Sequence, residues 1–487
     1  MAQNPVNSRL LMTPTFRQRA TDALADKALR SNFRGAMDFL REKRASVFTD
    51  ERELAELRAL GHQIRANVLS RLPSLLEQLE AQCQKNGIQV HWAETPNEAC
   101  EIIYQIMHRR NAKLAVKGKS MVSEEVGLNH YLETRGIECI ESDMGEYIVQ
   151  LAEETPSHII MPAIHKSKEQ IARLFEEKID GVGYTNNVDE LIGVGRTILR
   201  DKFFKADVGI SGVNFAVAET GTLCLVENEG NGRMCTTIPP VHIAITGIEK
   251  VVEKISDIPP LLSLLTRSAT GQRITTYFNM ISSPRKKGER DGPEEVHLVL
   301  LDNGRSRIYQ DTHLQETLRC IRCGACMNHC PVYSRIGGHA YGTVYPGPIG
   351  QVVMPQIEGL EKHGEMTEGC SLNGACGEVC PVEIPLADLI RTLRQKKSAA
   401  AIPPDNRAGI GSHRKKTEAI AWMFWKWVHR APAIYLMVTF AISRLRLLMP
   451  RSFGAWTRYH SAPKPAPQTL HELMRHRKQA TSKEDQL

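Results

Sequence analysis

The chain has 487 residues, of which 42% are hydrophobic and 24% charged, with a formal net charge of +7. This length suggests about three domains, and the composition is that of a globular protein with enough apolar residues for a core. A moderate positive charge does not by itself indicate nucleic-acid binding, and the chain opens with no apolar leader segment. We therefore expect a cytoplasmic protein without a nucleic-acid partner.

Residues 1–90 are rich in charged residues and carry apolar residues at helical spacing. Leu57, Ile64 and Val68 recur at intervals that place them on one face of a helix. We predict a helical region that packs against another part of the protein or against another subunit.

Residues 91–304 alternate between strand-like and helix-like segments. The pattern predicts strands at 114–116, 137–140, 158–161, 221–226, 241–245 and 296–301, and helices at 121–134 and 167–179. Such alternation favours a layered α/β domain with a mostly parallel sheet.

Two segments of this α/β domain are candidates for small-molecule or anion binding. Glu219 lies beside a glycine turn at the start of a strand, and Arg233 follows Gly230-Asn-Gly232. Glu219 and nearby hydroxyl and N–H groups could orient a substrate carboxylate, and Arg233 could pair with it in a bidentate way. The alternative is a tight hairpin turn with solvated charges. Similarly, residues 117–120 (Lys-Gly-Lys-Ser) could bind an anion at a helix start or could simply cap that helix.

Residues 305–398 contain seven cysteines in two runs of related spacing. The first run has the pattern C-x₂-C-x₂-C-x₃-C-P, which holds cubane iron–sulfur clusters; its cysteines are Cys320, Cys323, Cys326 and Cys330. The second run has Cys370, Cys376 and Cys380, with Asn373 where the pattern requires a cysteine. Two-cluster domains of this kind carry electrons.

The last cysteine of each run ligates the other cluster in two-cluster ferredoxins. Cluster A is therefore expected on Cys320, Cys323, Cys326 and Cys380 as a [4Fe-4S] cluster. Cluster B is expected on Cys330, Cys370 and Cys376, with no fourth thiolate because an asparagine amide is a poor ligand for iron. It could be a [3Fe-4S] cluster, a [4Fe-4S] cluster with a non-thiolate ligand, or a cluster completed by a remote residue such as Cys235.

The competing interpretations of the cysteines are structural zinc and disulfides. Zinc sites seldom use two runs of this form, and disulfides suit secreted chains. The runs are separated by residues 331–369, which contain glycine and proline turns and an apolar segment at 352–360. A helix is also predicted at 386–393. This long separation favours a helical two-cluster domain over a compact hairpin ferredoxin.

Residues 399–487 form a basic, aromatic tail. A linker is predicted at 401–406, followed by basic residues at 413–416 and by the segment Trp422-Met-Phe-Trp-Lys-Trp427. The apolar stretch at 431–443 is too short to span a bilayer. Aromatic and basic residues side by side fit a helix lying on an anionic membrane, and equally a helix docked on a partner subunit.

The chain as a whole resembles the lactate-utilisation protein B family (LutB, also called LldF), the iron–sulfur subunits of a bacterial L-lactate-oxidising system. The resemblance is carried by the cysteine runs and by residues 116–125, 142–149, 161–166, 218–233 and 236–242. It implies that 91–304 is a LUD domain, an α/β domain similar to the sugar-phosphate isomerase and CoA-transferase group (NagB/RpiA/CoA-transferase-like). An α-helical two-cluster ferredoxin domain at 305–398 and a helical tail complete the expected fold. Family members commonly have cysteine at the position of Asn373.

The resemblance also implies a function and partners. The chain is expected to be the iron–sulfur electron-transfer subunit of an L-lactate dehydrogenase complex that forms pyruvate and passes electrons to the respiratory chain. Its expected partners are a cysteine-rich-domain subunit and a smaller LUD-domain subunit, with the tail as a peripheral membrane contact on the inner face of the cytoplasmic membrane. The alternatives are a redox- or metabolite-sensing module and an electron-transfer subunit of a different dehydrogenase. A nucleophilic role for Glu219 would rest on fold analogy alone.

Overall fold

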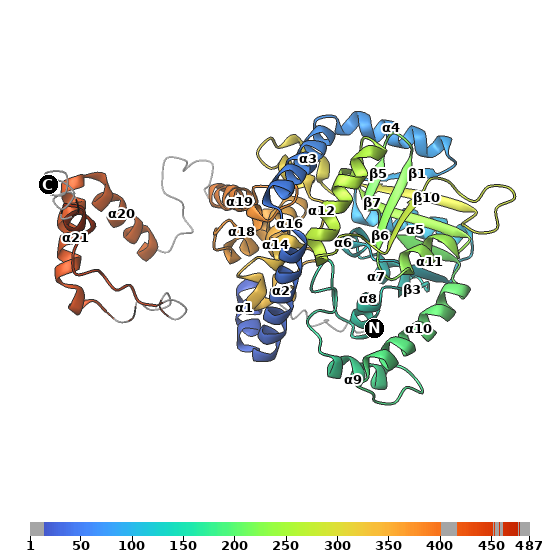
Figure 1. The fold of residues 1–487 in the computed structure, drawn as a ribbon, viewed down its shortest axis with the longest axis horizontal. Helices are drawn as coiled ribbons and strands as arrows, with labels where there is room; N and C mark the ends of the chain where they lie inside the picture. The colour runs from blue at the N-terminus through green and yellow to red at the C-terminus, as the bar shows by residue number, and fades with distance from the viewer. Residues whose placement is uncertain are drawn as a thin grey trace, which may run out of the picture. The chain divides into compact units, whose positions relative to one another are not determined.

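The computed structural model describes residues 14–400, 416–450, 452, 457, 461–475 and 477. The chain divides into two compact units, residues 1–397 and 398–487, and each is described by itself. Figure 1 shows the helices and sheets of the two units. The predicted linker at 401–406 and the basic residues at 413–415 lie outside the described residues.

Four helices precede the sheets: α1 (Phe16–Ala25), α2 (Lys27–Val47), α3 (Glu51–Ser70) and α4 (Leu72–Lys85). Aspartates cap two of them, since the side chains of Asp26 and Asp50 accept hydrogen bonds from the first turns of α2 and α3. The apolar faces point inward, and Phe33, Val68 and Leu75 are buried in the main core.

The central sheet has six strands in the order β1-β10-β7-β4-β2-β3, and all of its strand pairs are parallel. The strands are β1 (Gln89–Ala93), β2 (Leu114–Lys117), β3 (Glu138–Glu141), β4 (Val208–Ser211), β7 (Val241–Gly247) and β10 (Glu295–Leu301). Every residue of β4 and β7 is buried, as expected for central parallel strands covered on both faces. The structure confirms the predicted α/β domain with a parallel sheet.

A second sheet has four strands in the order β8-β5-β6-β9. Its strands are β5 (Phe215–Val217), β6 (Thr222–Glu227), β8 (Val251–Val252) and β9 (Tyr277–Ile281). β6 pairs antiparallel with both β5 and β9, and β5 pairs parallel with β8. The sequence analysis placed β6 in the α/β domain but did not separate this mixed sheet from the parallel one.

Eight α-helices join these strands. They are α5 (Pro96–Arg109), α6 (Met121–Glu125), α7 (Leu128–Glu133), α8 (Met144–Leu151), α9 (Lys168–Lys178), α10 (Val188–Lys205), α11 (Asn231–Thr237) and α12 (Ile258–Thr270), with short 3-10 helices η1 (Ile248–Lys250) and η2 (Ile255–Asp257). The helix predicted at 121–134 is interrupted because Gly127 adopts a left-handed conformation, with φ of 68°.

The strand predicted at 158–161 is wrong, because these residues form bends instead. The imidazole Nδ1 of His158 accepts hydrogen bonds from the backbone N–H groups of Ile160 and Met161, at 3.0 and 3.2 Å. These are the donors that a strand ladder would have used. The other ring nitrogen of His158 lies 3.0 Å from Asn328 Oδ1, so this segment is held against the cysteine-rich region.

The cysteine-rich region is helical, as predicted, with no strand between residues 305 and 400 of the described chain. Its α-helices are α13 (Arg305–Gln310), α14 (Ala325–Asn328), α15 (Tyr333–Ile336), α16 (Gly347–Ile357), α17 (Leu360–His363), α18 (Ala375–Glu378) and α19 (Leu386–Ala400). Between them lie the 3-10 helices η3 (Gln315–Arg319), η4 (His339–Tyr341) and η5 (Gly364–Gly369).

Two buried arginines join the α/β domain to the cysteine-rich region. Arg65 of α3 donates to the carbonyl oxygens of Val251 at 2.8 Å and Leu318 at 2.9 Å. Arg305 of α13 pairs in a bidentate way with Glu125 at 2.8 Å and with Glu249 at 2.6 Å, all three side chains being at most 2% exposed. A continuous polar network therefore holds the two regions in one fixed arrangement.

The second unit contains α20 (Lys416–Arg430), α21 (Pro432–Arg444) and the 3-10 helix η7 (Arg446–Leu448). The aromatic side chains of α20 are about half exposed, at 49% for Trp422, 53% for Trp425 and 51% for Trp427. No helix in the described part of the chain is long and apolar enough to cross a membrane.

Candidate iron–sulfur centre

The four cysteines assigned to cluster A surround one small void. Cys320, Cys323, Cys326 and Cys380 line it together with apolar side chains, among them Ile159, Ile321, Ile349 and Val382. Cys323, Cys326 and Cys380 are buried. The fourth thiol comes from the second cysteine run, as expected if the last cysteine of each run ligates the other cluster.

The three cysteines assigned to cluster B form a second set. Burial, followed by the charges of Cys370 and Cys330, raises the pKa of the Cys376 thiol to about 12. Cys370 is partly exposed, and Asn373 is exposed. Helix α14, which carries Cys326, contacts α18, which carries Cys376, so the two sets adjoin. Each set has one partly exposed cysteine, Cys320 or Cys370, but residues 371–373 of the second loop are exposed whereas Ile321 and Cys323 of the first are buried.

The two cysteine loops share one backbone conformation. Arg322 and Leu372 occupy equivalent positions and both have positive φ, at 62° and 55°. Gly324 and Gly374 follow, with φ of 76° and 84°. A left-handed conformation costs a non-glycine residue roughly 1–2 kcal/mol, so its occurrence in both loops indicates a shared functional geometry. Asn373 thus lies in a loop built like a cluster-binding loop, at the position that Cys323 takes in the first.

Backbone N–H groups point at the cysteine sulfurs in both runs. Arg322 N donates to Cys320 Sγ at 3.4 Å, and Leu372 N donates to Cys370 Sγ at 3.3 Å. Tyr333 N and Ile384 N donate in the same way to Cys330 and Cys380, at 3.4 and 3.3 Å. Hydrogen bonds of this kind stabilise cluster sulfurs and tune reduction potentials. The enclosed thiols, their apolar surroundings and these donors fit iron–sulfur clusters.

The remaining cysteines are placed elsewhere in the fold. Cys235 on α11 is fully buried in the α/β domain, with Sγ 3.3 Å from Ser142 Oγ. The backbone of Cys235 packs directly against Gly209 of β4. Cys235 is therefore fixed within the α/β core, and nothing in its surroundings brings it to the second loop. Cys83, Cys100, Cys139 and Cys224 are also buried thiols.

Glu219 and Arg233 are not brought together by the structure. Glu219 is exposed in the β5–β6 turn, where its carboxylate accepts a hydrogen bond from Ile255 N at 3.0 Å. Arg233 is exposed on α11 and lies over the Tyr277 ring, 5.8 Å from its centroid. These contacts correspond to the turn-and-solvated-charge alternative, and a catalytic role for either residue stays an untested prediction.

Glu227 lies in the same segment, 218–233, and the sequence analysis missed it. Its carboxylate accepts hydrogen bonds from the backbone of Gly232 at 2.5 Å and Arg233 at 2.6 Å, and from Asn279 at 2.8 Å. A glutamate three residues before the Gly-x-Gly sequence at a helix start was the available signal. Lys117 of the candidate anion site at 117–120 already has carboxylate partners, because its ammonium pairs with Glu124 at 3.0 Å and with Glu141 at 2.7 Å.

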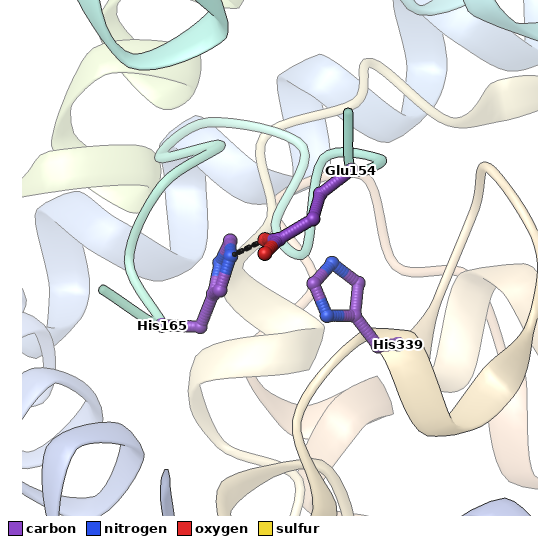
Figure 2. A group of neighbouring side chains, drawn as sticks. All are labelled: Glu154, His165 and His339. Carbon is purple, nitrogen blue, oxygen red and sulfur yellow. Dashed lines mark hydrogen bonds and ion pairs between the residues drawn. The ribbon is translucent and has the colours of Figure 1, made fainter. Parts of the chain in front are cut away.

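A group of polar side chains closes the junction between the 154–165 loop and the cysteine-rich region. Figure 2 shows His165 and His339 on either side of the Glu154 carboxylate. His165 Nε2 lies 2.6 Å from Glu154 Oε2, and its Nδ1 lies 2.7 Å from Ser157 Oγ. His339 Nε2 donates to Thr155 O at 2.7 Å, which fixes its tautomer. Lys166 also pairs with Glu154, at 2.6 Å. The polar groups therefore have protein partners, and they link the 154–165 loop to the cysteine-rich region.

An α/β domain carrying a mixed second sheet, joined rigidly to a helical two-run cysteine region, defines an iron–sulfur protein with a LUD domain. Comparison with known families agrees. The LUD domain matches residues 76–301, the 4Fe-4S dicluster domain matches 316–384, and the C-terminal region of lactate utilisation protein B matches 392–479.

Similar proteins extend the match along most of the chain. The Bacillus licheniformis lactate utilization protein B is 43% identical over 87% of this chain and 87% of its own length. The Bacillus subtilis lactate utilization protein B is 45% identical over 79% of this chain and 80% of its own length. An Escherichia coli protein described as the uncharacterized electron transport protein YkgF is 44% identical over 79% and 80%. The chain belongs to the lactate utilisation protein B family, which with the dicluster domain supports an iron–sulfur electron-transfer role in lactate utilisation.

Proposed function

We propose that this chain is the electron-transfer subunit of a complex that oxidises L-lactate to pyruvate. The oxidation releases two electrons and two protons, and each cluster, when bound, accepts and donates one electron at a time. The observation that carries the proposal is the pair of adjoining thiol sets, one on a largely buried loop and one on a loop exposed at residues 371–373. Such a pair suits a relay that splits a two-electron oxidation into single-electron steps toward a respiratory acceptor.

The residues around the thiols have distinct roles in this relay. Ile159 and Ile321 help to exclude water from the thiols of cluster A, and the backbone donors at Arg322 and Ile384 stabilise negative charge on their sulfurs. The exposed residues 371–373 of the second loop leave the other set where a partner's redox centre can approach. We propose the cysteine-rich-domain subunit and the smaller LUD-domain subunit as the partners.

The proposal is tested by mixing the anaerobic holoprotein with these two partner proteins, L-lactate and a quinone-like dye. We expect dye reduction that requires all three proteins, together with pyruvate formation in a ratio of one pyruvate per two electrons. If the two partners alone reduce the dye at the same rate with or without this chain, the electron-transfer role is wrong.

For cluster B we propose a [3Fe-4S] cluster held by Cys330, Cys370 and Cys376. The loop keeps a cluster-binding backbone, but its fourth ligand position is the exposed Asn373, whose amide binds iron weakly. An iron at that corner would face solvent and be lost on oxidation.

Replacing Asn373 with cysteine should convert this cluster to a [4Fe-4S] form. The backbone already has the required conformation, so we expect the iron content to rise from about seven to about eight per chain. The oxidised three-iron EPR signal should disappear at the same time. Asn373→Ser, which supplies no thiolate, is the matched control and should leave both readings unchanged. An unaltered three-iron signal in Asn373→Cys would contradict the assignment of this position.

We further propose that α20 lies on an anionic membrane surface. Three tryptophans and Phe424, 57% exposed, give the helix a large aromatic surface, and Lys426 lies among them. This combination suits the headgroup region of a bilayer.

Removing two of these aromatics should weaken membrane binding. We expect the chain to float with vesicles containing phosphatidylglycerol, and Trp422→Ser/Trp425→Ser to lower the bound fraction by about tenfold because each tryptophan contributes roughly 150–250 Å² of contact area. Trp92→Ser, a half-exposed tryptophan of the first unit, is the control. If wild type and the double variant float equally, or if neither floats, the aromatic surface of α20 binds a partner subunit instead of a membrane.

A further inference from the structure

A cavity of about 350 Å³ lies between the α/β domain and the first cysteine loop. Its walls are mainly apolar and come from the parallel sheet, from β6 and from α12, including Ile245, Leu225 and Ala269. Arg322, two residues from Cys320 and next to Cys323, closes the side facing cluster A. Apolar walls with a few polar groups at defined points are typical of small-molecule sites.

The polar groups at the cluster end of this cavity include two cations with donors to spare. Lys250 of η1 is 7% exposed, and no hydrogen bond or ion pair of its ammonium occurs among the described residues. Arg322 uses Nη2 to reach Glu249 at 3.4 Å, whereas its buried Nη1 has no hydrogen-bond partner in the described structure. A buried charged donor without a partner is costly, and Arg322 Nη1 is such a donor. With the Lys250 ammonium on the same cavity, the two cations point to an anionic ligand.

The geometry of Arg322 is fixed from two sides. Its guanidinium lies over the Tyr345 ring at 4.4 Å, and Tyr345 OH donates to Glu125 at 2.7 Å. Its backbone is held in the left-handed conformation described above. The guanidinium is therefore preorganised, and only a small loss of side-chain entropy opposes ligand binding.

The rest of the cavity limits the shape of the anion. Lys119 also lines it, but its ammonium donates to Ile160 O. Asp143, Glu227 and Glu229 line the cavity too, and Asp143 and Glu227 cap α8 and α11 as negative charges. These carboxylates would repel a second negative group that extends toward them. A monocarboxylate with a short uncharged body fits this distribution better than a dicarboxylate.

We propose that Lys250 and Arg322 bind the carboxylate of a small 2-hydroxy or 2-oxo monocarboxylic acid in this cavity, beside cluster A. The choice among monocarboxylates rests on the proposed function, whose substrate and product belong to this class. The site places such a ligand against the first cysteine loop, which carries Arg322 between Cys320 and Cys323.

The test is calorimetric titration of the anaerobic holoprotein, without partners, with L-lactate and with pyruvate. Lactamide, which lacks the charge, and succinate, which carries a second one, are the comparison ligands. We expect saturable binding of one monocarboxylate per chain, with affinity for lactamide and succinate at least about tenfold weaker. No saturable binding of L-lactate or pyruvate up to about 50 mM would overturn the proposal, since that is well above the millimolar range of weak specific sites.

Two variants separate ligand binding from other roles of the cations. Lys250→Met should lower affinity about 10- to 100-fold while the melting temperature stays equal or rises, because a buried unpaired charge is removed. Ala269→Leu keeps both cations but fills the cavity, and should also abolish binding. Lys254→Met, an exposed lysine of the same region, is the control.

The outcome distinguishes this inference from the function on which it rests. If Lys250→Met and Ala269→Leu bind L-lactate and pyruvate as wild type does, the cations serve only to offset the charge of the cluster, and the carboxylate site is wrong. Electron transfer with the partner proteins would then still stand. Conversely, normal carboxylate binding by a chain that transfers no electrons would overturn the proposed function and leave the cavity as a sensing site.

Discussion

Replacement of Cys326 with alanine is expected to remove cluster A and to abolish electron transfer. Cys326 is buried on α14 and lines one void with the other three thiols of its set. Losing it removes one of four thiolates from an enclosed site that offers no replacement ligand in its lining. Iron content should fall by about half or more, and electron transfer by at least about tenfold, because cluster assembly and local folding are coupled.

Cys235→Ser is the matched control for this experiment. Cys235 is equally buried, but it lies in the α/β core beside Ser142, away from both cysteine loops. Its replacement should leave iron, sulfide and electron transfer unchanged, and this would also eliminate it as a remote ligand of cluster B. Full iron content in Cys326→Ala, or a loss of iron in Cys235→Ser, would show that the ligand sets are assigned wrongly.

Replacement of Arg305 with methionine is expected to destabilise the first unit by about 3–5 kcal/mol. The change leaves Glu125 and Glu249 as buried carboxylates without their main partner. Burial alone would raise the pKa of Glu249, but the charges of Arg305 and Arg322 lower it to about 2. Because the same network joins α6, η1, α13 and Tyr345, the loss should appear as one lowered unfolding transition in denaturant titration.

The pH dependence of this variant gives a second check. In the native chain the pKa of Glu249 and that of Glu125 are lowered, so their contribution to stability is present near neutral pH and is lost on acidification. In Arg305→Met the unpaired carboxylates become protonated more easily, and their penalty falls as the pH drops. The deficit relative to wild type should therefore shrink from about pH 7 to about pH 5.

Arg110→Met provides the comparison, since Arg110 pairs with Glu295 at a site where both side chains are partly exposed. A surface pair contributes at most about 1 kcal/mol, so this variant should unfold nearly as wild type does. Equal stability of Arg305→Met and Arg110→Met would contradict a structural role for the buried network.

Much of the fold could be predicted because its signals are local. β7 and β10 are short apolar runs between turn residues, and central parallel strands need no more than that. The segment at 158–161 has the same composition, but a histidine side chain from within it took the backbone donors that a strand would use. Similarly, the mixed sheet could not be separated from the parallel one, because short apolar runs do not record which sheet they join.

The candidate site divides along the same line. The cysteine ligands could be predicted from the sequence because the cluster they surround sets their spacing. The same pattern predicts that the last cysteine of each run ligates the other cluster. The cavity could not be predicted from the sequence, because Lys250 follows a strand of the α/β domain whereas Arg322 lies in a cysteine loop. Only the fold brings these two cations together on one cavity, where Arg322 Nη1 has no hydrogen-bond partner in the described structure.

The central claim is that this chain holds two electron-carrying clusters on the thiol sets of cluster A and cluster B. It is tested most directly by EPR of the anaerobically purified chain, as isolated and after dithionite reduction, with iron and sulfide counted on the same sample. We predict about seven irons per chain, a three-iron signal in the oxidised sample and a reduced [4Fe-4S] signal after dithionite. A chain that retains little iron after careful reconstitution, with neither signal, would contradict the electron-transfer function.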